Sequence, residues 1–156
     1  MALTKIADGG MPSGAVLQVV QTVKTDDFST SSSSFVDITG LSAVITPLST
    51  SSKVLVDVRI GGYDVTSAST VFFNIVRGST TLSTGTAGTG TACTFAVTAN
   101  ADRGENAGML LLDSPSTTSA TTYKIQTKTG GINVDINKRS GLHSNISTIT
   151  LTEIAG

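Results

Sequence analysis

The sequence predicts an all-β fold, a jelly-roll-like antiparallel β-sandwich of about eight to nine strands. Val and Ile alternate with polar residues over short runs, which is the period of a half-buried strand. Turn signals recur about every 8 to 15 residues, and no segment shows the period of an amphipathic helix. A length of 156 residues suits a jelly roll better than an immunoglobulin sandwich of about 100 residues.

The first residues are predicted to lie outside the sandwich. Residues 1–14 contain glycines and a proline and show no period, so we interpret them as an arm. Leu3, Ile6 and Met11 are its candidate docking residues, through which the arm could dock on a neighbouring protein. A loosely attached terminus explains the same stretch equally well. The sandwich domain is predicted to span residues 15–156.

The first predicted strands differ in how regular their patterns are. Residues 15–23 are apolar on both faces, and we expect them to be buried at least in part on both. Residues 35–40 and 42–47 are two short runs that follow a polar loop. Residues 53–63 have the clearest alternation. Their side chains predicted to face the core are Val54, Val56, Val58 and Ile60.

The middle strands are separated by turns of recognisable chemistry. Residues 70–78 alternate in polarity, and Gly78 with Ser79 is predicted to turn a hairpin. Pro115 stops a nearly continuous apolar run. Further strands are predicted at residues 93–99, 109–115, 121–130 and 132–138.

The chain ends in a predicted strand, with the sequence NISTITLTEI before the final Ala-Gly. Ile149, Leu151 and Glu153 share one face of this strand, and three threonines lie on the other. We expect Ile149 and Leu151 to face the core and the strand to be held inside a sheet.

Two segments are too polar or too rich in glycine for regular strands, and they are the candidate receptor-facing loops. The first spans residues 83–92 and the second residues 100–108. The candidate binding residues in them are Thr86, Thr89, Arg103, Glu105 and Asn106.

The sequence contains no catalytic signature. His143 is the single histidine, and no serine lies in a Gly-x-Ser-x-Gly motif. Carboxylates are sparse and most are predicted in turns or on polar faces. The single cysteine, Cys93, is predicted to be a small buried hydrophobe. We therefore predict that the protein is not an enzyme and uses no cofactor.

Asn133, Asp135 and Asn137 occupy alternate positions, which predicts that their side chains share one face of a strand. Oxygen ligands in this arrangement could help to bind Ca²⁺. Alternating polar residues on a solvated strand face explain the pattern without a metal, and the sequence leaves both interpretations open.

Charge and hydropathy restrict the partners. The net charge is −1, and the ten Lys and Arg residues are dispersed without a basic run, which argues against nucleic acid. No apolar run reaches the roughly 18 residues of a membrane span, so no membrane insertion is expected. The first residues lack the pattern of a signal peptide, which predicts synthesis in a cytoplasm without standard secretion.

The order of several segments resembles small virion proteins and C-terminal tail-fibre domains of tailed bacteriophages, especially phages of aquatic bacteria and cyanobacteria. The segments are GAVLQVVQTVKTDDFSTSSSSFVDITGLSAVITPLSTSSKVLVDV, VFFNIVRG, LLLDSPSTTSATTYKIQTKTG, INVDIN and STITLTEIAG. The resemblance covers nearly the whole chain from about Gly14 and carries no catalytic motif. It implies a jelly-roll-like sandwich, a homotrimer, and a place on the virion surface after synthesis in the host cytoplasm.

Two functions follow from this resemblance. The first is a short trimeric fibre or knob that attaches to a bacterial surface glycan or protein through its loops, with the arm docked on capsid or tail proteins. The alternative is a capsid decoration protein that stabilises the head lattice. Only residues 1–15 precede the sandwich, which argues against a long fibre. The absence of Trp and the presence of only two Tyr argue against a sugar-stacking surface.

Overall fold

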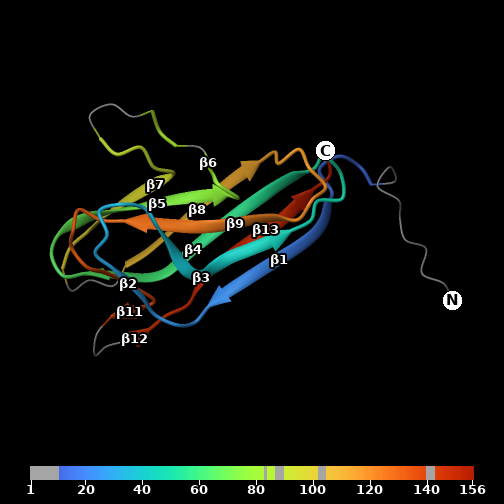
Figure 1. Cartoon of the computed structure of the whole chain (residues 1–156). Helices are drawn as coiled ribbons and strands as arrows, with labels where there is room; N and C mark the ends of the chain where they lie inside the picture. The colour runs from blue at the N-terminus through green and yellow to red at the C-terminus, as the bar shows by residue number, and fades with distance from the viewer. Residues whose placement is uncertain (1–10, 83, 87–89, 102–104, 140–142) are drawn as a thin grey trace.

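The computed structural model describes residues 11–82, 84–86, 90–101, 105–139 and 143–156, and these residues form strands and no helix. Two antiparallel sheets pack face to face, as Figure 1 shows. Sheet A contains β1 (Val16–Lys24), β2 (Phe28–Thr30), β4 (Lys53–Val65), β8 (Glu105–Asp113), β10 (Val134–Ile136) and β13 (Ser147–Ile154). Sheet B contains β3 (Val36–Ile45), β5 (Ser69–Arg77), β6 (Thr80–Leu82), β7 (Phe95–Ala99) and β9 (Thr121–Lys128). A separate short pair consists of β11 (Lys138–Arg139) and β12 (His143–Ser144).

The predicted all-β, jelly-roll-like sandwich is confirmed. Eight strands of the described chain have five or more residues, and they divide equally between the sheets. In sheet A their order is β8-β4-β13-β1, and in sheet B it is β7-β5-β9-β3. The first and last strands are therefore neighbours, and most connections cross from one sheet to the other. This is the strand order of an eight-stranded jelly roll.

Strand β4 is at the centre of sheet A and shows why the alternating pattern folds as it does. Val54, Val56 and Val58 are fully buried, and Ile60 is 1% exposed. Each contributes about 1.5–3 kcal/mol through burial of its side chain. The intervening residues, of which Arg59 is one, point to the opposite face of the sheet. The predicted inward face of this strand is confirmed.

Strand β13 lies between β1 and β4, so the prediction that the last strand is held inside a sheet is confirmed. Ile149 and Leu151 face the core and are fully buried. Glu153 is on the same face and is also fully buried. Its carboxylate accepts hydrogen bonds from the Leu48 backbone N–H at 2.7 Å and from the Gln18 amide. These donors replace water, which a buried carboxylate requires.

Three strand predictions are corrected. Residues 35–40 and 42–47 belong to one strand, β3, which is interrupted by a bulge where Gly40 has a φ of +83°. Strand β1 is not buried on both faces, because no other part of the described chain covers its outer valines. Strand β8 begins at Glu105, because β4 continues far enough to pair with residues that we expected in a loop.

Two predictions about buried polarity are also corrected. Asn137 does not share a strand face with Asp135, because β10 ends at Ile136 and Asn137 has a φ of +65°. Asn137 is fully buried, its amide donates to the backbone carbonyl of Lys24, and its carbonyl oxygen accepts from the Ser147 hydroxyl. Cys93 is free and only partly buried, before the start of β7.

Leu151→Asp is expected to prevent folding, because it places an unpaired charge in the core between the two sheets. Thr148→Asp is the matched control on the same strand, since Thr148 points outward and pairs with Arg59 of β4. We expect this control to cost about 1 kcal/mol or less. Circular dichroism and thermal melting measure both. A folded Leu151→Asp protein with an unchanged melting temperature would contradict the assignment.

Candidate functional site

The sandwich has two ends that differ in their chain segments. At the terminal end, the start of β1 lies beside the chain's last residues, as Figure 1 shows. The Gly14 N–H donates to the Ala155 carbonyl, and the Ala155 N–H donates to the Ala15 carbonyl, both at 2.8 Å. The far end contains the β4–β5 turn and the start of β8. The nine residue steps from Val54 to Tyr63 separate the ends by about 30 Å.

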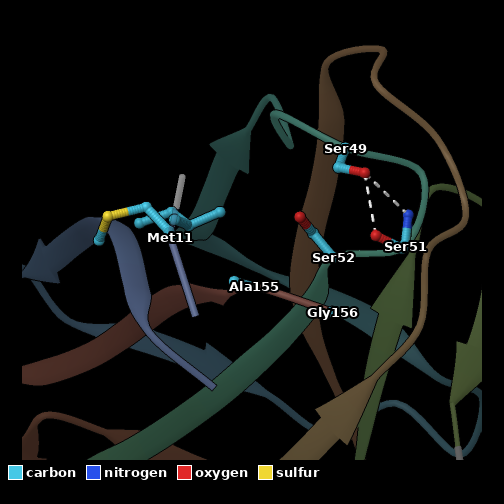
Figure 2. Close-up of a pocket in the computed structure, with 7 residues that line it drawn as sticks. Met11, Ser49, Ser51, Ser52, Ala155 and Gly156 are labelled. Carbon is cyan, nitrogen blue, oxygen red and sulfur yellow. Dashed lines mark hydrogen bonds between the residues drawn. The ribbon is translucent and has the colours of Figure 1, made fainter. Parts of the chain in front are cut away.

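A pocket of about 270 Å³ lies at the terminal end. Figure 2 shows Met11 on one side of it and the serines of the β3–β4 turn across from it. The turn is held by the Ser49 hydroxyl, which contacts the Ser51 hydroxyl at 3.0 Å and accepts from the Ser51 N–H. The described residues that line the pocket are Met11, Leu17, Ser49, Ser51, Ser52, Ala155 and Gly156.

The chemistry of this terminal pocket suits an apolar segment with hydrogen-bonding groups. Met11 and Leu17 supply apolar surface, and the serines supply hydroxyl groups. Ser52 is 1% exposed, and its hydroxyl has no hydrogen-bond partner among the described residues. None of the described lining residues has a side chain that ionises near neutral pH, so the pocket offers packing and hydrogen bonds.

Strand β8 is an edge of sheet A, and a tyrosine holds each of its ends. The Tyr63 hydroxyl donates to Glu105 at 2.8 Å, at the start of the strand. At its end, the Tyr123 hydroxyl of sheet B donates to Asp113 at 2.7 Å. Arg77, also of sheet B, forms an ion pair with Asp113 at 2.7 Å. Glu105 is therefore a strand residue with a structural hydrogen bond.

A shallow hollow of about 350 Å³ lies on sheet A toward the far end. Its lining includes Gly61 and Gly108, where a side chain would collide with the Ile146 carbonyl and the Val58 carbonyl, respectively. Arg59 and Asn106 supply its polar groups. The Arg59 guanidinium is held by Asp57 at 2.8 Å. Asn106, a candidate receptor-facing residue, is therefore exposed beside this hollow on a strand.

Sheet B carries an aromatic row at the far end, formed by Phe35, Lys128 and Phe72. Lys128 pairs with Phe72 in the sheet, and its ammonium lies 5.4 Å from the centroid of each ring. On the neighbouring row, Asp37 accepts from Lys124 and Gln126, both at 2.7 Å. These two donors hold the pKa of Asp37 below its usual range. Half-buried rings beside hydrogen-bonding groups can bind a flat, partly apolar ligand.

The aromatic row could not be identified from the sequence, because its members are far apart in the chain and only strand register joins them. The remaining candidate residues have different outcomes. Thr86 is exposed, in the connection between β6 and β7. Met11 lies at the terminal pocket. Four candidates lie outside the described residues: Leu3, Ile6, Thr89 and Arg103.

The described part of the chain bears on the expectations about metals and membranes. It contains no group of three His, Cys, Asp or Glu side chains that could hold a metal ion. Asp135 accepts hydrogen bonds from Ser29 and Asn133, whereas Asn137 is directed into the interior. No helix in these residues is long and apolar enough to cross a membrane. The side chain of His143 lies outside what the structure describes.

No family model matches this chain, and no curated protein matches it. The function proposed below therefore depends on the geometry of the described residues and on the resemblance to phage virion proteins.

Alkali is expected to destabilise the protein through its two tyrosines. Burial, followed by the hydrogen bonds to Glu105 and Asp113, raises the pKa of Tyr63 and of Tyr123 well above the ordinary value of 10.0. A raised folded-state pKa stabilises the fold fully below about pH 10, and this stabilisation is lost as the pH rises further. Phenolate absorbance should therefore appear together with unfolding. Ionisation of either tyrosine near pH 10 with the circular dichroism unchanged would contradict this.

Ser52→Ala is expected to change the free energy of unfolding by less than about 0.5 kcal/mol, because the hydroxyl has no partner among the described residues. Ser147→Ala is the matched comparison. The Ser147 hydroxyl donates to Asn137 and accepts from the Gly61 N–H, so its loss should cost about 1–3 kcal/mol. Urea unfolding measures both variants. Equal costs would show that Ser52 has a hydrogen-bond partner.

Proposed function

We propose that this protein is a non-enzymatic surface protein of a tailed-phage virion, a trimeric short fibre or knob that attaches the particle to its host. The observation that carries the proposal is the separation of two different surfaces by the length of the sandwich. The terminal end offers a pocket for docking, and the far end offers groups that can recognise a ligand.

The terminal end is suited to attachment on the virion. Met11 of the predicted arm lies at the terminal pocket, whose described lining combines apolar side chains with serine hydroxyls. A segment of a capsid or tail protein can fill such a pocket by packing and neutral hydrogen bonds. This end also contains the start of β1, so an arm that precedes β1 begins where docking would take place.

The far end is suited to a bacterial surface glycan. Phe35 and Phe72 offer ring surface, and Lys128 lies between them. The Asp37, Lys124 and Gln126 side chains beside them can hydrogen-bond to sugar hydroxyls. The absence of Trp and the presence of only two Tyr argue against a glycan site. Surface phenylalanines that are brought together by register remove much of that objection.

The alternative function, capsid decoration, is supported by a different observation. Both tyrosines of the chain are buried and are engaged by carboxylates, so neither is available at the surface to stack on a sugar. If the protein is a decoration protein, the aromatic row is a set of contacts within sheet B that binds no ligand. The two functions predict different positions on the virion and different effects of changes in the aromatic row.

Phe72→Thr is expected to weaken binding of the purified protein to host cells about tenfold, since loss of the ring contact removes about 1.5 kcal/mol. Thr keeps the strand preference of this position. Val44→Thr is the matched control, because Val44 is 51% exposed on the same sheet toward the terminal end. Unchanged binding and unchanged competition with infection for the folded Phe72→Thr protein would favour the decoration function.

Labelling of purified virions tests the position directly, with antibodies against this protein and electron microscopy. Label at discrete fibres or at the tail supports the attachment function. Label spread over the capsid lattice supports decoration, and absence of label from the virion contradicts both. Sedimentation at micromolar concentration is expected to show a trimer.

A further inference from the structure

The outer face of sheet A, defined here as the outward side of β8, β4, β13 and β1, is unusually apolar. Eight large apolar side chains are classed as exposed among the described residues, and five of them lie on this face. Their exposed fractions are 56% for Val16, 59% for Val19, 45% for Val23, 55% for Leu110 and 50% for Leu112. Single exposed apolar residues are ordinary, but a cluster on one face marks an interaction surface.

The strand register makes this face continuous. Leu112 of β8 pairs with Leu55 of β4, Leu55 pairs with Thr152 of β13, and Thr152 pairs with Val19 of β1. One row of Leu, Leu, Thr and Val therefore crosses the whole sheet. In the next row toward the terminal end, Ile154 of β13 pairs with Lys53 of β4 on one side and with Val16 of β1 on the other.

The charge of the face favours a copy of the same surface as its partner. Its outward charged residues on these four strands are Lys53, Asp57, Arg59 and, after the β4 bulge, Asp64. Asp57 and Arg59 neutralise each other through their own ion pair at 2.8 Å. Lys53 and Asp64 lie at opposite ends of β4 and carry opposite charges, so these four residues sum to no net charge. Two such faces can meet without the repulsion between like charges that disfavours self-association.

The size of the face suits a small interface. Four strands about 4.8 Å apart and about seven residues long cover about 450 Å² in projection. The projecting leucine and valine side chains add to this area, and a standard interface takes roughly 800 Å² from each partner. The β8 and β1 edges border the face, so the same contact would also shield strand edges that invite uncontrolled pairing.

We propose that the outer face of sheet A binds a second copy of this chain. The inference rests on the proposed function in one respect, because it identifies the surface through which the proposed trimer assembles. In a trimer the contact is heterologous, so one part of each outer face meets a different part of the neighbour's outer face, and the exposed leucines and valines become buried. The terminal pocket and the aromatic row remain outside this contact, at the two ends of the sandwich.

Leu110→Asp with Leu112→Asp tests the proposal by sedimentation and native mass spectrometry. We expect the wild-type protein to be a trimer and the double variant a monomer with an unchanged circular dichroism spectrum. Loss of two central apolar contacts should raise the dissociation constant at least about 100-fold. Leu110→Thr with Leu112→Thr, which keeps the strand preference of β8, should show a loss in the same direction if the aspartates impair folding.

Val44→Asp is the matched control, because Val44 is 51% exposed on sheet B, and it should leave the trimer intact. A wild-type dimer that the double variant dissociates would support the contact and contradict the trimer. A double variant that is still a trimer would show that the outer face of sheet A is not the contact, although the protein is a trimer. A wild-type monomer would overturn both, and virion labelling would then test the location separately.

Discussion

The pairing of β13 with β1 on one side and with β4 on the other is the constraint on which the structure depends. It joins the first and last strands to the centre of sheet A, with Val16 opposite Ile154. The same strand places Leu151 in the core and Glu153 beneath the loop that follows β3. Because its partners lie so far away in the chain, we expect slow folding, on the order of milliseconds to seconds.

Strict alternation made part of this fold predictable from the sequence. In β4 and β13, apolar residues at every second position identify the inward face whatever the neighbouring strands are. Features that depend on a partner were not predictable. Strand β8 starts at Glu105 because β4 extends opposite it and Tyr63 binds its carboxylate. Asn137 is buried because the end of β1, the turn after β1 and β13 supply its hydrogen bonds, which no local pattern indicates.

The candidate sites show the same division. Met11 could be identified from the sequence as an apolar residue in an aperiodic arm, and it lies at the terminal pocket. The aromatic row could not be identified, because alternation gives the face of Phe35, Phe72 and Lys128 but not their register. The exposure of the β1 valines could not be predicted from the sequence either. An apolar residue has the same sequence pattern whether its own chain or a second copy covers it.

The positions of the two ends determine how the fold would carry force. Both the start of β1 and the end of β13 are at the terminal end, and the two strands run antiparallel. A pull on the arm against a ligand held at the far end would run along the strands. It would load the hydrogen bonds between β1 and β13 together, in shear. A pull between Gly14 and Gly156 would instead open the same bonds one at a time, so resistance to rupture would depend on where the protein is held.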